Sequence, residues 1–171
     1  MTSRSAAATP LHLVKLAVGC DSVSQLKEWV RERMRQAKAK GLPQRHVHIT
    51  RMSPKRPDEL LNGGSLYWVI KGQVACRERL VGIESFRDKD GIARCRLMME
   101  PKIIAVSPRP MRPFQGWRYL PGKDAPPDLG KAGVAVHLFN QRDISGILGM
   151  SLIDATLKDA AAKADALAMR L

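Results

Sequence analysis

Cations and aromatic rings alternate in the short segment RPFQGWRYL, residues 112–120. Arg112 and Arg118 can bind phosphate, and Trp117 presents a flat ring for stacking. Gln115 adds both a hydrogen-bond donor and an acceptor. Together these groups can hold an unstacked nucleotide. Packing is the alternative, in which the aromatics close the end of a barrel and arginine pairs with tryptophan for structural reasons.

A second group of cations precedes a predicted short helix that ends in a glycine pair. Arg51, Lys55 and Arg56 lie beside the helix start, where unpaired N–H groups favour phosphate. Gly63 and Gly64 permit a close approach of the backbone to a ligand. No Gly-Lys-Ser or Gly-Lys-Thr follows, which disfavours ATP hydrolysis. Solvated surface cations remain the alternative.

The next segment, SLYWVIKG, reads as a strand whose side chains alternate between two faces. Trp68 shares a face with apolar neighbours, which favours a packed core residue over a stacking platform. Lys71 follows on the other face.

Two histidines give an enzymatic alternative. His46 and His48 lie on the same face of a predicted strand, and HIT matches the H-x-T unit of two-histidine phosphoesterases. Those enzymes need two such units, and the sequence has one. A metal site would need a third ligand, for which Asp58 and Glu59 are the nearest acids. We therefore expect no catalytic residues, no metal and no cofactor, and leave open a nucleotide- or phosphoester-processing enzyme using both histidines.

Charge separates the chain into two parts. The 171 residues carry a net charge of +13; residues 1–120 hold 23 Lys and Arg against 10 Asp and Glu, while residues 121–171 hold six of each. A basic region favours a polyanionic partner such as RNA or DNA. Three cysteines without metal spacing, no secretion signal and no long apolar stretch predict a cytoplasmic protein with no membrane contact.

Local patterns predict an α+β fold. Ser22 with Gln25 forms a capping box at the start of an amphipathic helix that runs to Lys40. The other predicted elements are strands at 11–19 and 45–51, a short helix within 53–64, four strands at 65–72, 73–86, 92–100 and 102–107, and an ordered loop or strand within 109–128.

These elements predict one domain with two appendages. We expect a disordered N-terminus at 1–10 and a single α+β domain at 11–129, built on a small antiparallel or mixed β-barrel. The extension at 130–171 is expected to be largely helical or partly disordered, with a peripheral C-terminal helix that can dock on a protein partner.

Three stretches, LHLVKLAVGCDSV, HITRMSPKRPDELLNGGSLYWVIKGQVACRERL and RPMRPFQGWRYLPGKDAPPDL, resemble an uncharacterised alphaproteobacterial family of unknown function. A weaker resemblance is to PUA-like modules, the PUA, ASCH and EVE domains. There a short helix with a glycine pair leads into a strand, and the adjacent cleft binds RNA or a modified base. The first resemblance implies a bacterial, cytosolic origin. The PUA-like resemblance implies RNA binding in a cleft near Gly63, Gly64, Ser65, Trp68 and Lys71.

The resulting prediction is a domain that binds RNA around a modified or flipped base. Arg51, Lys55 and Arg56 would hold phosphate, and Trp117 and Arg118 would contact the base. The alternatives are the histidine-based enzyme and a non-catalytic protein-interaction module that uses the C-terminal helix.

Overall fold

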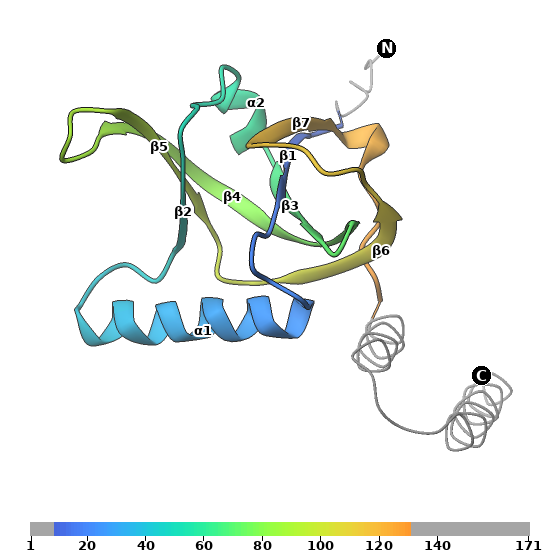
Figure 1. Cartoon of the computed structure of the whole chain (residues 1–171), viewed down its shortest axis with the longest axis horizontal. Helices are drawn as coiled ribbons and strands as arrows, with labels where there is room; N and C mark the ends of the chain where they lie inside the picture. The colour runs from blue at the N-terminus through green and yellow to red at the C-terminus, as the bar shows by residue number, and fades with distance from the viewer. Residues whose placement is uncertain (1–8, 131–171) are drawn as a thin grey trace, which may run out of the picture. The chain divides into compact units, whose positions relative to one another are not determined.

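The structure, a computed structural model, describes residues 9–130. Its elements follow the predicted order of strands and helices (Figure 1). The strands are β1 (Leu11–Leu16), β2 (His46–Thr50), β3 (Ser65–Ile70), β4 (Gln73–Arg87), β5 (Ala93–Met99), β6 (Ile104–Pro110) and β7 (Trp117–Pro121). The helices are α1 (Val23–Ala39), α2 (Pro57–Leu61) and the 3-10 turn η1 (Gly122–Asp124). The predictions for residues 1–8 and 131–171 lie outside the described residues.

One mixed sheet organises the fold. The strand order is β2-β5-β4-β3-β1-β7, with β6 paired to β4. β1 and β3 are parallel, and the other pairs are antiparallel. β2 and β7 are the two ends of this order, so the sheet is open. The predicted α+β class is confirmed, but the predicted small β-barrel is not shown, because the sheet does not close.

The long strand β4 explains why the sheet changes partners along its length. Its first half pairs with β3 and β6, and its second half pairs with β5. The register with β5 shifts between Leu80 and Gly82, where an added Cβ would press on the Met98 side chain. β6 therefore follows β5 along one edge of β4 instead of extending a simple meander.

Strand β3 is buried on both faces and separates two apolar clusters. Leu66, Trp68 and Ile70 belong to the larger cluster, while Tyr67 and Val69 belong to the smaller one. This is the alternation that the sequence predicts, because successive side chains of a strand point to opposite faces. A strand buried on both faces positions its one tryptophan firmly.

Helix α1 forms where the sequence predicts it, and its first turn is capped. The Gln25 backbone N–H donates to Ser22 Oγ at 3.0 Å. Val23, Leu26 and Val30 are buried, and the helix packs against β2. The capping box and the apolar face together give α1 a defined direction beside β2.

Helix α2 begins later than predicted. Arg56 is its N-cap residue and makes no side-chain cap bond, and Pro57 opens the helix. Ser53, the predicted start, instead shares a hydrogen bond with Ser85 at 2.8 Å. Arg56 is ion-paired with Glu59 on the surface of α2. This helix therefore has five residues, fewer than two turns.

Strand β7 comes from the predicted proline-bounded segment and pairs antiparallel with β1. All three cysteines are buried and free, as the sequence predicts. In the part of the chain that the structure describes, no helix has the length and apolarity needed to cross a membrane.

Candidate functional site

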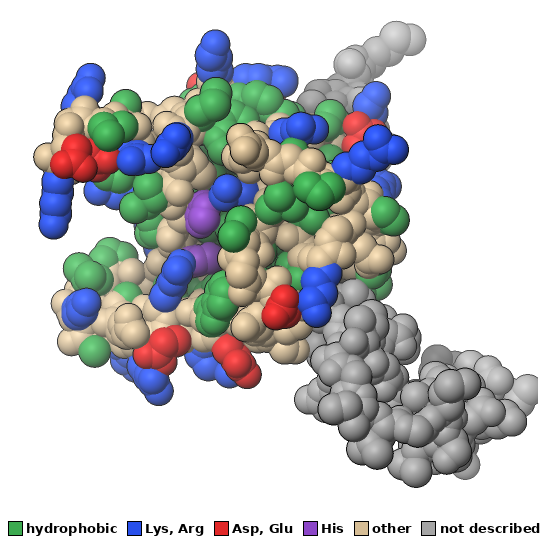
Figure 2. All heavy atoms as spheres, viewed as in Figure 1, with side chains coloured by type: hydrophobic (Ala, Val, Ile, Leu, Met, Phe, Trp, Pro, Cys, Tyr) green, Lys and Arg blue, Asp and Glu red, His purple; other side chains and the backbone are tan. Residues whose placement is uncertain are grey.

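Two adjoining cavities lie between β2 and the strands β1 and β7. The first, called the inner cavity, has a volume of about 330 Å³, and the second, the outer cavity, has about 660 Å³. Lys15 and Ile49 line both, so they are two parts of one cleft. Figure 2 shows histidines in a hollow of this face, with cationic and hydrophobic side chains around them. Both volumes fall in the range of small-ligand sites.

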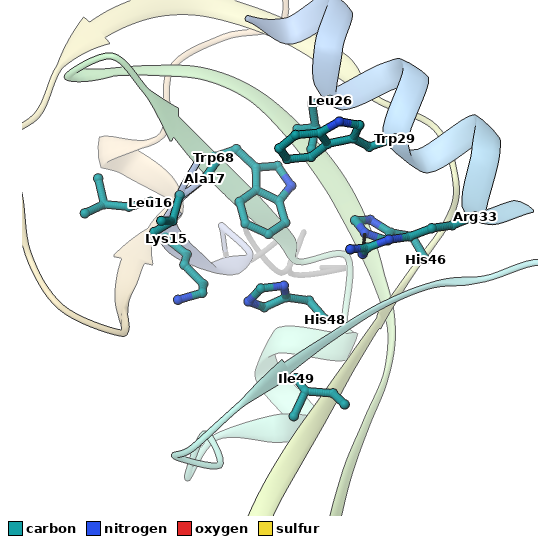
Figure 3. A pocket seen from close by; sticks show the side chains of 11 residues that line it. Lys15, Leu16, Ala17, Leu26, Trp29, Arg33, His46, His48, Ile49 and Trp68 are labelled. Atoms are coloured by element: carbon teal, nitrogen blue, oxygen red, sulfur yellow. Dashed lines mark hydrogen bonds between the residues drawn. The ribbon is translucent and has the colours of Figure 1, made fainter. Parts of the chain in front are cut away.

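The inner cavity is walled by side chains from α1, β1, β2 and β3 (Figure 3). Trp68 of β3 is 3% exposed, whereas Trp29 of α1 is 40% exposed. Trp29 and Arg33 are four residues apart on α1 and therefore share a helix face toward the cavity. Two tryptophan rings thus flank this space, one fixed in the core and one at the rim.

A buried carboxylate holds one side of the inner cavity in place. Glu78 is fully buried and accepts hydrogen bonds from Trp68 Nε1 at 2.9 Å and His46 Nδ1 at 2.8 Å. Arg33 Nη1 lies 3.1 Å from His46 Nε2. A guanidinium only donates, so Nε2 is the acceptor and Nδ1 carries the proton given to Glu78. This chain fixes the ring of His46 and engages both of its nitrogens.

His48 differs from His46 because one of its ring nitrogens has no partner. Among the described residues, His48 Nε2 is the one buried side-chain nitrogen or oxygen without a hydrogen bond. Its ring meets Trp68 edge-on, with centroids 5.3 Å apart. Burial, followed by the nearby charge of Lys15, lowers the pKa of His48 to about 4. The imidazole is therefore neutral near pH 7 and keeps one unused polar atom in the cavity.

Lys15 stands between two of the three tryptophans of the cleft, Trp68 and Trp117. Its register partners are Trp68 on β3 and Trp117 on β7. Burial lowers the pKa of its ammonium group. Its one hydrogen bond to a described residue, from Nζ to the Gly116 carbonyl, is long at 3.5 Å. Lys15 is thus a partly desolvated cation with donor capacity to spare.

The outer cavity is closed on one side by aromatic residues that anchor the loop after β2. Trp117 Nε1 donates to the Met52 carbonyl at 2.9 Å, and Tyr119 OH accepts from the Lys55 backbone N–H at 2.9 Å. The two rings meet edge-on at 5.1 Å. These bonds hold the loop against β7 and leave the Trp117 ring as cavity wall.

The remaining aromatic of this segment has a packing role. Phe114 is 8% exposed in the smaller apolar cluster, and the Arg118 guanidinium lies 4.7 Å from its ring centroid. A structural arginine–aromatic pair is therefore present in this segment, as the packing alternative predicts. The ring in the pair is Phe114, whereas the expected ring was a tryptophan.

Charge in the cleft has one sign. The inner cavity is lined by Lys15 and Arg33, and the outer cavity by Lys15, Arg51 and Arg118. Among the described residues, neither lining includes an Asp or Glu side chain. Glu78 lies behind the inner wall, where its oxygens accept from His46 and Trp68. The open surface of the cleft is therefore cationic and aromatic, which suits an anionic ligand with a flat ring.

The structure brings five of the predicted site residues to the cleft. Trp68 lines the inner cavity, while the outer cavity is lined by Arg51, Gln115, Trp117 and Arg118. These positions come from β3, from the loop after β2 and from the segment that enters β7.

The other predicted residues lie outside both linings. Lys55 and Arg56 adjoin the outer cavity through Tyr119, since Lys55 bonds to its hydroxyl and the Arg56 guanidinium lies 5.7 Å from its ring centroid. Arg112 is exposed before β7. Lys71 has a positive φ of 48° and lies in the β3–β4 turn.

The glycine pair and Ser65 make structural contacts away from the cleft. A Cβ on Gly64 would collide with the backbone carbonyl oxygens of Leu60 and Leu11, so only glycine fits there. Gly63 has a positive φ of 87°. Ser65 is buried, and its Oγ accepts from Arg77 Nη1 at 3.0 Å. Close backbone packing therefore explains Gly64 without a ligand.

Sequence reasoning missed four residues of this site, namely Lys15, Trp29, Arg33 and Glu78. A signal for Glu78 was present, because it alternates with Cys76 and Leu80 on the apolar face of its strand. A carboxylate on such a face needs buried donors. Lys15 had no comparable signal, since its importance comes from its cross-strand neighbours.

The metal alternative finds no ligand set in the described region. Among residues 9–130, no group of three or more His, Cys, Asp or Glu side chains is placed to hold a metal ion. Glu59, one of the acids considered, is paired with Arg56. The acid that meets His46 is Glu78, 32 positions further along the chain.

The fold and cleft define an α+β domain with an open mixed sheet and a cationic, aromatic cleft. The chain belongs to the family described as Protein of unknown function (DUF1489), which matches residues 13–138. The predicted membership of a family of unknown function is thereby confirmed. Searches of curated proteins and of solved structures found no match. The resemblance to PUA-like modules has no support from these comparisons.

Proposed function

We propose that this protein binds single-stranded nucleic acid, RNA in particular, by taking one unstacked nucleotide into the cleft. The observation that carries the proposal is the composition of that cleft. Cations and aromatic rings line it, and none of the carboxylates within residues 9–130 does. Phosphates attract clustered cations, and bases stack on aromatic faces whatever their sequence.

The two cavities suggest how a nucleotide divides between them. The inner cavity has the rings of Trp29 and Trp68 and the unpaired His48 nitrogen, which suits a base. The outer cavity has Arg51 and Arg118, which suit the adjoining phosphates. Lys15 lines both and would bridge base and backbone. A cytoplasmic location is part of this proposal, because RNA is the partner.

The test is a titration of the purified full-length chain with a mixed-sequence single-stranded RNA at two salt concentrations, followed by tryptophan fluorescence. We expect saturable binding that weakens as salt rises, because each phosphate contact releases counterions. Arg51→Ala combined with Arg118→Ala should weaken binding on the order of tenfold.

A matched control removes the same charge elsewhere. Arg87 and Lys89 lie at the exposed hairpin between β4 and β5 and line neither cavity. Arg87→Ala with Lys89→Ala should therefore leave affinity within about twofold of the parent, since only diffuse charge is lost. Equal losses from both pairs would reduce the proposal to general charge attraction. No binding at low salt would overturn it.

The samples from the binding titration also test the enzymatic alternative. His46 already uses both ring nitrogens, which leaves His48 as the histidine free to act on a phosphoester. Cleavage of the RNA that disappears in His48→Ala while binding persists would favour the enzyme over a pure binding protein. The protein-interaction alternative rests on the C-terminal extension, which lies outside the described residues.

A further inference from the structure

The polar groups that face the inner cavity have a specific hydrogen-bonding pattern. Lys15 and Arg33 can only donate, because neither side chain has an acceptor. His48 Nε2 is buried and unpartnered, and a neutral imidazole pairs with either a donor or an acceptor according to its tautomer. Figure 3 shows Lys15 and His48 entering the cavity from β1 and β2, below the Trp68 ring.

With His48 in the tautomer whose Nε2 is unprotonated, this pattern distinguishes between the edges of nucleobases. An exocyclic amino group is a donor, and beside Lys15 it would face a second donor with no acceptor between them. A carbonyl oxygen accepts from Lys15, and a ring N–H next to that carbonyl can donate to the lone pair of His48 Nε2. A base that cannot form hydrogen bonds with the polar groups of the site binds more weakly, because those groups then stay buried and unsatisfied.

We propose that the inner cavity selects a base with a lactam edge, a ring N–H beside a carbonyl as in uracil, with Lys15 donating to the carbonyl and His48 accepting from the N–H. The inference rests on the proposed nucleic-acid binding and adds its specificity. Trp29 and Trp68 supply the ring contacts that any base can use, so discrimination falls to these two polar side chains.

The structural environment supports these two roles. His48 is held edge-on to Trp68, and Trp68 is itself fixed by its bond to the buried Glu78. Lys15 is set by its strand register between Trp68 and Trp117. His48 is therefore preorganised, and Lys15 projects from a fixed backbone position. Among the described residues, neither group has a close partner to give up on binding beyond the long Lys15 contact with Gly116.

The test compares three RNA nonamers by equilibrium binding to the full-length chain: U9, C9 and a U9 in which every base is 3-methyluracil. Cytosine exchanges the 4-carbonyl and the N3–H of uracil for an amino group and a bare ring nitrogen, and it keeps the 2-carbonyl. The methylated base keeps both carbonyls but lacks the N–H. We expect U9 to bind about tenfold more tightly than either of the others, the effect of one or two buried hydrogen bonds.

Two variants assign the preference to its residues. Lys15→Met should reduce the difference between U9 and C9, because only the part contributed by His48 then remains. His48→Phe should erase the difference between U9 and its methylated form. Lys89→Ala on the β4–β5 hairpin should keep both differences. The methylated nonamer tests the His48 contact without any mutation, so the inference does not depend on a variant folding.

The outcomes separate this inference from the proposed function. Equal binding of all three nonamers, still weakened by Arg51→Ala with Arg118→Ala, would overturn the lactam preference and leave nucleic-acid binding in place. Tighter binding of C9 than U9 would also overturn it. Binding of none of them at low salt would overturn both proposals.

Discussion

Two polar sites on opposite faces of β1 use similar residues in different ways. The His12 cluster consists of His12, Ser65, Tyr67, Arg77 and Asp128. His12 Nδ1 accepts from the Ser65 backbone N–H at 3.0 Å, and Arg77 makes two 2.7 Å bonds to Asp128. In the inner cavity, Lys15 and His48 have no such close partners.

Burial lowers the pKa of both His12 and His48 to about 4, with the Arg77 charge adding to the effect at His12 and that of Lys15 at His48. Desolvation is therefore not what separates the two sites. The two sites differ in the hydrogen bonds made by their key groups. His12 Nδ1, Arg77 and Asp128 bond within the protein, whereas His48 Nε2 has no hydrogen bond among the described residues. A buried histidine nitrogen without a hydrogen bond calls for an explanation, and a binding site supplies one.

The largest effect should come from the carboxylate that supports the inner cavity. Glu78→Ala leaves Trp68 Nε1 and His46 Nδ1 without their acceptor in a buried place. We expect the free energy of unfolding to fall by about 3 to 5 kcal/mol, the range for breaking a buried charged network. Urea unfolding measures it. A loss below about 1 kcal/mol would show that Glu78 is not held as described.

The two histidines should respond to the same substitution with opposite sign. His12→Phe removes the acceptor of the buried Ser65 N–H and should lower the free energy of unfolding by about 1 to 3 kcal/mol. His48→Phe removes an unpaired buried nitrogen and should raise stability by about 1 kcal/mol. Paired urea titrations check both. Equal losses would erase the contrast between the two sites.

A smaller effect is expected at the edge of the His12 cluster. Asp128 is about half exposed, at 46%, so Asp128→Ala should cost about 1 kcal/mol of stability through the lost Arg77 bonds. RNA affinity should not change, because Asp128 lines neither cavity of the cleft. Thermal unfolding and the fluorescence titration measure the two quantities side by side. A change of affinity would mean that the two sites are coupled.

Acid should destabilise both sites gradually. His12 and His48 titrate near 6.5 when unfolded and near 4 when folded, so the unfolded chain binds more protons between these values. The contribution of these histidines to the free energy of unfolding is fully present above about pH 6.5 and decreases as the pH falls toward 4. Below about pH 4 these two groups cause no further change. The free energy of unfolding, measured across this pH window, should depend less on pH in His12→Phe and in His48→Phe than in the parent. An unchanged slope would contradict the two lowered pKa values.

Local structure was largely predictable because its causes act over a few residues. The capping bond of Ser22 to Gln25 and the two-sided alternation of β3 were both readable from neighbouring residues. The start of α2 was not, because Ser53 bonds to Ser85 on a distant strand instead of capping the helix. Propensity yields to tertiary contacts of this kind.

The candidate site was predictable in part. Residue type marked Arg51 and Trp117 as ligand groups, and the structure places both at the outer cavity although 65 positions separate Met52, next to Arg51, from Trp117. Gly64 was assigned to a ligand for its flexibility, whereas its place is set by the Leu60 and Leu11 carbonyls. A glycine required by packing and one required by a ligand look alike in a single sequence.

By itself the sequence determined the basic charge, the α+β class, the capped helix and the two-faced strand β3, since these follow from composition and short-range periodicity. Only the tertiary structure decided that the sheet stays open and that Lys15, His48 and Trp68 meet there. The physical reason is strand pairing. β1 pairs in parallel with β3, whereas β2 pairs with β5 and not with β1. Such pairings join residues far apart in the chain, and no local pattern encodes which hydrogen-bonding groups they leave unpaired.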